Sequence, residues 1–165
     1  MAKPPKDHTS FGSSTYFVTA STWGHRSLFQ TERMAKLFLE TIFRYRDNKK
    51  YSLHEFVLMP DHFHLLLTPS QGVTLERTMQ FIKGGFSYRV GKELELKMEI
   101  WERGYVNHRV RDLTDFINHA DYIQRNPVEA GLAAAPADYP YCSAHAGFDL
   151  DPIPQGLKPQ SSSAA

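Results

Sequence analysis

Residues 59–67, which read Met-Pro-Asp-His-Phe-His-Leu-Leu-Leu, constrain the fold more than any other stretch of the chain. Side chains alternate between the two faces of a strand, so Phe63 and Leu65 are predicted on a buried face. His62 and His64 then share the opposite face, with Cα atoms roughly 6–7 Å apart, close enough for two imidazoles to hold one metal ion. From this pattern alone, a pair of half-exposed strand histidines is an equally good interpretation.

Composition indicates a single globular domain. The chain has 165 residues, 41% of them hydrophobic, which is enough for one domain with a core. Net charge is +1, so any surface that binds nucleic acid must be local. The single cysteine, Cys142, excludes an internal disulfide and a cysteine-rich zinc site. Because we find no long apolar run and no signal-peptide pattern, we expect a cytoplasmic protein with no membrane partner.

The pattern along the chain predicts the element order β-α-β-β-α-β. Four segments rich in β-branched and aromatic residues read as strands: residues 15–21, 51–59, 62–68 and 105–110. Two helices with apolar stripes separate them, one beginning after Thr31 and one over residues 74–90. Gly84-Gly85 interrupts the second helix and indicates a kink or a close approach. This order is typical of the ferredoxin-like (RRM-like) α+β fold, with a four-stranded, mainly antiparallel sheet. Helices cover one face of such a sheet, so we expect the histidine face to be open.

A third helix is predicted over residues 112–126, ended by Pro127. At about 100° per residue, its side chains divide into two groups. The apolar group is expected to be buried and comprises Leu113, Phe116, Ile117, Ala120 and Ile123. The opposite side carries Asp115, His119, Tyr122 and Asn126. An ordinary solvated face would account for these polar residues equally well.

Both ends of the chain are polar and low in apolar residues. Residues 1–14 include Pro4-Pro5 and are predicted to form a flexible arm. Residues 149–165 are rich in proline, glycine, glutamine and serine, and we expect a disordered tail there. Residues 15–148 would then form the single folded domain.

Two longer motifs carry a resemblance to a known family. Residues 59–66 resemble the His-hydrophobic-His motif of the IS200/IS605-like Y1 transposases of the HUH superfamily. Residues 122–132, Tyr-Ile-Gln-Arg-Asn-Pro-Val-Glu-Ala-Gly-Leu, resemble the tyrosine motif of one branch, the REP-associated tyrosine transposases. Shorter matches fall at residues 16–19, 81–83, 100–104 and 138–143, so the resemblance spans roughly residues 14–146.

The resemblance implies an activity as well as a fold. The family cuts and rejoins single-stranded DNA beside hairpins, so palindromic, REP-like hairpins are the implied partners. By motif position Tyr122 is the implied nucleophile, which would form a 5′-phosphotyrosine link and release a free 3′-OH. The implied cofactor is a divalent metal, Mg²⁺ or Mn²⁺, held by His62, His64 and Asn126. Relatives include helix-exchanging dimers and monomers, so a monomer and a homodimer are both open.

The chemistry requires these residue types. A metal neutralises a phosphodiester and fixes it for attack, and imidazole ligands suit Mn²⁺ better than Mg²⁺. A tyrosine hydroxyl is mostly protonated at neutral pH and needs activation. His119, one turn before Tyr122, is a candidate proton partner, and an ordinary surface histidine is at least as good an interpretation. The candidate phosphate contacts are Lys83, Arg89, Arg103, Arg109 and Arg111.

Two other functions remain open at this point. A module of the same fold could bind hairpin DNA or RNA without cutting it. A metal-dependent phosphoesterase could use water as the nucleophile, with Tyr122 in a structural role. Within the covalent mechanism, Tyr88 and Tyr105 compete with Tyr122, because both are expected near the open face.

Overall fold

A computed structural model describes residues 14–157 of the chain. The arm predicted at residues 1–14 therefore lies almost wholly outside the described residues, as does the end of the predicted tail from residue 158 onward. The strands are β1 (Tyr16–Ser21), β2 (Tyr51–Met59), β3 (His62–Pro69) and β4 (Val106–Arg109). The helices are η1 (Trp23–His25), η2 (Leu28–Gln30), α1 (Glu32–Asp47), α2 (Leu75–Met79), η3 (Gln80–Gly84), α3 (Gly85–Glu93), α4 (Leu113–Glu129) and η4 (Pro136–Asp138). Within residues 14–157, no helix has the length and apolar character required to cross a bilayer.

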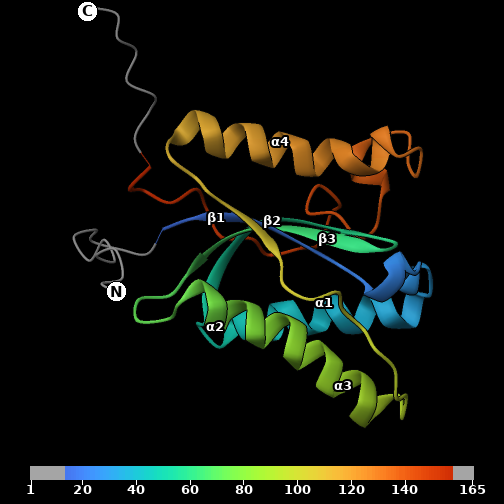
Figure 1. Cartoon of the computed structure of the whole chain (residues 1–165). Coiled ribbons are helices and arrows are strands. Elements are labelled where there is room, and N and C mark those ends of the chain that lie inside the picture. The colour runs from blue at the N-terminus through green and yellow to red at the C-terminus, as the bar shows by residue number, and fades with distance from the viewer. Residues whose placement is uncertain (1–13, 158–165) are drawn as a thin grey trace, which may run out of the picture.

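The sheet has the predicted ferredoxin-like arrangement. Its strand order is β2-β3-β1-β4, and every neighbouring pair is antiparallel. The helices α1, α2 and α3 lie on one side of this sheet (Figure 1). Phe63, Leu65 and Leu67 are fully buried in the core on that side, as the alternating pattern predicted.

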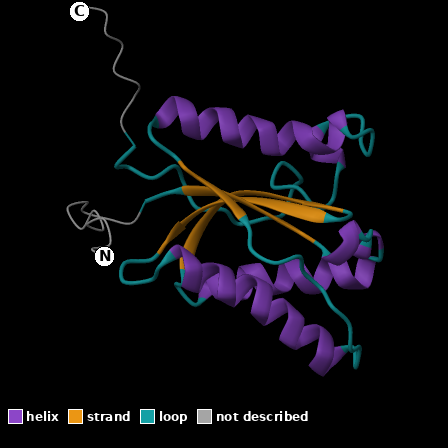
Figure 2. Ribbon diagram, viewed as in Figure 1, coloured by secondary structure: helices purple, strands orange, loops and turns teal. Residues whose placement is uncertain are grey.

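The opposite face of the sheet is not open, and this prediction is wrong. Helix α4 crosses that face (Figure 2), and a second hydrophobic core fills the space between them. Val57 and Leu66 from the sheet meet Phe116 and Ile123 from α4 in this core. The sheet is apolar on both faces over part of its area, and such a surface is stabilised by a covering element on each side. The histidine face is therefore partly enclosed.

Helix α4 departs from its predicted form in two respects. It continues through Pro127 to Glu129, because a proline in the last turn removes few helix hydrogen bonds and its buried ring adds packing. The Pro127 carbonyl accepts a hydrogen bond from the Leu132 N–H at 2.8 Å. Ile117, predicted in the buried stripe, is 51% exposed because the helix packs through Phe116 and Ile123 instead.

The helical run from α2 to α3 contains the predicted irregularity at Gly84-Gly85. A π-helical turn, η3, separates α2 from α3 and ends at Gly84. A Cβ added to Gly85 would lie 2.7 Å from the ring of Tyr45, which is closer than real Cβ contacts allow. Gly85 therefore marks a close approach of α3 to α1, one of the two interpretations of this pair of glycines.

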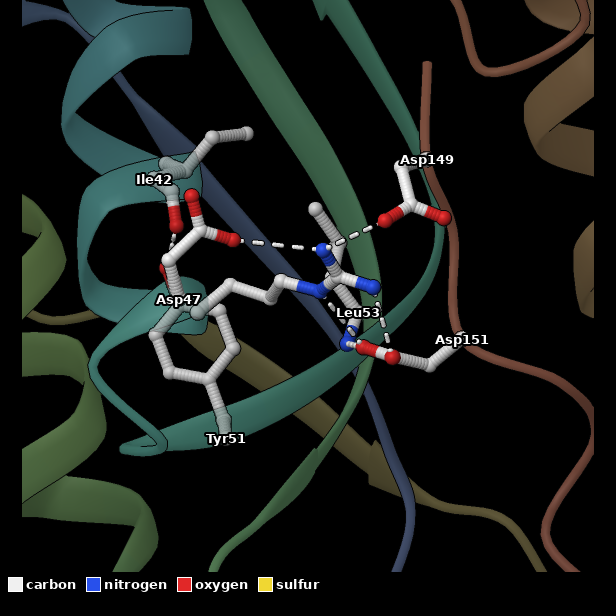
Figure 3. A network of polar contacts seen from close by, with 7 residues as sticks. Ile42, Asp47, Tyr51, Leu53, Asp149 and Asp151 are labelled. Atoms are coloured by element: carbon white, nitrogen blue, oxygen red, sulfur yellow. Dashed lines mark hydrogen bonds and ion pairs between the residues drawn. The ribbon is translucent and has the colours of Figure 1, made fainter.

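The C-terminal segment is ordered further than the sequence predicted. Residues 139–143 run along the outer edge of β2, where the Leu58 N–H donates to the Tyr141 carbonyl and the Ser143 N–H donates to the Phe56 carbonyl, both at 2.8 Å. The prediction of a disordered tail from residue 149 is wrong for Asp149 and Asp151, whose carboxylates pair with the guanidinium of Arg46 (Figure 3).

Asp151 also joins this segment to the sheet through its own backbone. Its carboxylate accepts a hydrogen bond from the Leu53 N–H at 2.7 Å, and its N–H donates to the Leu53 carbonyl at 2.8 Å. The bidentate Arg46–Asp151 pair and these two bonds hold the C-terminal segment against the beginning of β2. A polar, loop-like composition did not reveal these specific pairings.

Candidate active site between the sheet and helix α4

Strand pairing places both histidines of β3 on the face that α4 covers. His62 lies opposite Ser21 and His64 lies opposite Thr19 in the antiparallel register of β3 and β1. The two imidazole rings have their centroids 4.8 Å apart. The predicted shared face is confirmed, and the rings are close enough to serve one site.

Hydrogen bonds orient both imidazoles through the same ring atom. His64 Nδ1 lies 2.7 Å from the Thr19 hydroxyl, and His62 Nδ1 lies 2.7 Å from a carboxylate oxygen of Asp61. When each Nδ1 carries the proton and donates, each Nε2 presents a lone pair. Partners of this kind are the usual support of metal-binding histidines. Sequence reasoning missed the role of Thr19, because only the strand register places it opposite His64.

Two buried polar atoms, one on β3 and one on α4, lack a hydrogen-bond partner. Among the described residues, the buried side-chain nitrogen and oxygen atoms without a partner are His64 Nε2 and Asn126 Oδ1. Buried polar atoms are nearly always hydrogen-bonded, so such exceptions indicate a functional role or a bound ion. Both atoms belong to the predicted ligand set, and an imidazole nitrogen with an amide oxygen suits a divalent cation. The residues present therefore fit the implied metal.

The ring of Tyr122 lies beside that of His64. Its ring centroid is 5.3 Å from that of His64 and 5.9 Å from that of Phe17. The side chain is 40% exposed, so the hydroxyl is accessible from solvent while the ring packs against the site. Asn126 follows Tyr122 by four residues, about one turn of α4, so both lie on the same side of the helix.

The two competing tyrosines belong elsewhere. Tyr88 is 68% exposed on α3, a helix on the other side of the sheet. Tyr105 packs against the core beneath α1 and α3, and burial raises its pKa. The expectation that both lie near the histidine face is therefore wrong, because it assumed an open face.

His119 belongs to a separate cluster of side chains, together with Asp115 and His108. Its Nδ1 lies 2.8 Å from the Asp115 backbone carbonyl, one turn earlier in α4. Its ring stacks on His108 of β4 at a centroid distance of 4.7 Å and contacts Phe17 in a tilted arrangement, also at 4.7 Å. The contact with Phe17, which also touches Tyr122, relates this cluster to the tyrosine.

The five basic candidates fall into two groups. Arg89 is buried, and its guanidinium binds Glu93, Glu40 and the Thr41 hydroxyl. The amine of Lys83 donates to the carbonyls of Glu102 and Gly104, and burial lowers its pKa. Both side chains are bound to groups of the protein itself, so neither is a candidate for a phosphate contact. Arg103, Arg109 and Arg111 lie in or beside β4, and all three are exposed.

Acidification is expected to weaken the fold through His64. Burial, followed by the proximity of His62, lowers the pKa of His64 to about 3. Below about pH 6.5 His64 is protonated in the unfolded chain but stays neutral in the folded chain. The free energy of unfolding therefore falls as pH falls. The slope approaches about 1.4 kcal/mol per pH unit for one such group, in the window between about pH 6.5 and pH 3.

Urea denaturation in EDTA at pH 7.5 and pH 5.5 measures this effect. His54, whose pKa is also lowered by burial, contributes in the same direction. A His64→Gln variant, which cannot take up a proton, should therefore lose less stability between the two pH values than the wild type. Equal losses in both proteins would contradict the assignment to His64.

A ferredoxin-like sheet thus carries a histidine pair on β3 opposite a tyrosine on helix α4. Comparison with known proteins identifies the class of protein to which this fold belongs. The family model "Transposase IS200 like" matches residues 11–126. The chain therefore belongs to the IS200-like transposase family, whose members in general cut and rejoin DNA.

Two of the similar proteins are REP-associated tyrosine transposases. The chain is 25% identical over 132 residues to the REP-associated tyrosine transposase of Escherichia coli (strain K12), covering 79% of this chain and 76% of that protein. Its fold is similar to that of a REP-associated tyrosine transposase solved bound to a REP hairpin, with a TM-score of 0.68 at 24% identity. That match covers 87% of this chain and 82% of the solved one.

Proposed function

We propose that this chain cuts and rejoins single-stranded DNA beside hairpins, with Tyr122 as the covalent nucleophile. The observation that carries the proposal is that Tyr122 packs against His64, whose buried Nε2 has no hydrogen-bond partner. Asn126 Oδ1, the other such atom among the described residues, lies about one turn further along α4. The likeness to a protein solved with a REP hairpin supports hairpin DNA as the substrate.

The proposed reaction exchanges one phosphoester for another. The Tyr122 oxygen attacks the phosphorus, the bond to the 3′ oxygen breaks, and the phenol proton is lost while the 3′ oxygen gains one. The product is a 5′-phosphotyrosine and a free 3′-OH. Reversal with a second 3′-OH rejoins DNA without an external energy source, because the covalent link conserves the phosphoester.

His62, His64 and Asn126 would hold the divalent metal, Mg²⁺ or Mn²⁺. When bound, such an ion supplies charge neutralisation and orientation of the phosphodiester. A histidine must be neutral to bind a metal ion, and burial keeps His64 neutral because it lowers the pKa of this residue to about 3. The Thr19 hydroxyl and the Asp61 carboxylate each contact the Nδ1 atom of one imidazole, so Nε2 is the nitrogen left to each histidine for the ion.

Helix α4 packs on the sheet of its own chain, which supports action as a monomer. A homodimer is the alternative. Arg103 precedes β4 in the sequence and Arg111 follows it, and both are exposed. They are our candidates for phosphate contacts, because phosphate binding needs accessible cations. Arg109, in β4 itself, is a third candidate.

A hairpin DNA labelled at its 3′ end, on the strand downstream of the cut, tests this proposal. With Mn²⁺ present, we expect a labelled protein band that survives denaturation, and mass spectrometry should place the adduct on Tyr122. Binding without any adduct, under every metal tried, would favour the binding module instead. Turnover without protein-linked DNA would favour the phosphoesterase that uses water.

A further inference from the structure

A second cluster of ligand-type side chains lies between β4 and the beginning of α4. It consists of His108 from the strand and of Asp115 and His119, which are one turn apart on the helix. One potential ligand atom from each of the three lies within 4.8 Å of the other two. None of these residues belongs to the His62, His64 and Asn126 set.

The separations within the cluster suit a small cation. His108 Nε2 is 2.8 Å from Asp115 Oδ2, and His119 Nδ1 is 3.2 Å from Asp115 Oδ1. Ligand atoms around a tetrahedral ion with bonds of about 2.0–2.1 Å are about 3.3 Å apart. The two nitrogens lie near different oxygens of the Asp115 carboxylate. An ion bound at His119 Nδ1 would replace the proton that this nitrogen donates to the Asp115 backbone carbonyl, and a fourth position would remain for water.

The surroundings hold the carboxylate ionised and in place. Although burial acts to raise the pKa of Asp115, hydrogen bonds from the Arg111 N–H and from His108 hold that pKa below its ordinary value. The N–H of Asp115 itself is bound to the Asp112 side chain, which caps α4. An oriented anionic ligand between two imidazoles is the donor set of Zn²⁺ and related transition metals.

We propose that His108, Asp115 and His119 form a second, separate site for a transition-metal cation. An ion there would tie the first turns of α4 to the edge strand β4. The ring of Phe17 contacts His119 and also contacts His64 and Tyr122. The second ion would thus help to position the helix that carries Tyr122, and the proposal stands whether or not Tyr122 is the nucleophile.

Zn²⁺ uptake by the chelator-stripped protein, measured by calorimetry and elemental analysis, tests this site without any DNA. We expect His64→Ala, which removes the first site, to leave one bound equivalent. Adding Asp115→Asn, which keeps the size of the side chain and removes its charge, should abolish that equivalent. A matched control is His145→Ala in the same background, because His145 bonds only to the Ala137 carbonyl and lies outside both clusters.

A His108→Cys variant separates a metal ligand from a hydrogen-bond partner. A thiolate is a good ligand for Zn²⁺ and Co²⁺, so this variant should retain the ion and show a Co²⁺–thiolate charge-transfer band. Circular dichroism establishes that each variant is folded. No uptake by folded His64→Ala protein, or uptake unchanged by Asp115→Asn, would overturn the proposal and leave the cluster as a hydrogen-bonded support.

Discussion

Replacing Tyr122 with phenylalanine is expected to reduce cleavage of hairpin DNA to the background level and to abolish the covalent adduct. A covalent mechanism has no substitute once its nucleophilic oxygen is removed. The phenylalanine ring retains the contacts with His64 and Phe17. Because the side chain is 40% exposed, loss of the hydroxyl should change the free energy of unfolding by less than about 1 kcal/mol.

Three measurements separate this outcome from a general loss of function. Urea denaturation should give nearly the same midpoint for the variant as for the wild type, and hairpin affinity should persist. Tyr88→Phe is the matched control, since it removes the same atom from an exposed tyrosine on the other side of the sheet. Cleavage that survives in Tyr122→Phe, or an adduct mapped to Tyr88 or Tyr105, would remove the central residue of the proposed mechanism.

His64→Ala is expected to abolish Mn²⁺-dependent cleavage while hairpin affinity changes little. The ion is proposed to bind at the Nε2 atom of His64, which is buried and has no hydrogen-bond partner. Contacts to the DNA backbone should supply most of the affinity, so the dissociation constant should remain within a few-fold of the wild-type value. Wild-type protein in excess EDTA should behave as the variant does.

Asn126 provides a more discriminating pair of variants. Asn126→Ala removes the amide oxygen and should reduce cleavage as strongly as His64→Ala. Asn126→Asp keeps an oxygen at the same place and adds a charge that Mn²⁺ accepts, so part of the activity should return at raised Mn²⁺ concentration. Equal activity of the Ala and Asp variants, or full activity of His64→Ala in EDTA, would contradict the metal assignment.

Local patterns accounted for much of the fold and for the faces on which the candidate site residues lie. The strand alternation placed His62 and His64 on one face, and the helical period placed Tyr122 and Asn126 one turn apart. Both patterns depend only on neighbours along the chain, which is why sequence alone was sufficient for them. The same reasoning predicted β2 with its observed bounds.

Packing decided which of these local faces meet. Nothing in the periodicity of α4 indicated that it would cover the histidine face, and the open face was predicted wrongly for that reason. Arg89 is a comparable case, because an arginine on a helix is ordinarily exposed, whereas this one lies among Glu40, Thr41 and Glu93. Burial of a charge depends on partners supplied by other elements, here mainly α1.

Sequence by itself therefore determined the order of the elements, the paired histidines and the spacing of the tyrosine motif. Tertiary structure alone decided that Thr19 supports His64, that His64 lies against Tyr122, and that His108 joins Asp115 and His119. These residues are distant in the chain, and their contacts follow from strand register and from the packing of α4 on the sheet. Register and packing minimise the free energy of the whole molecule, so no local pattern of residues encodes them.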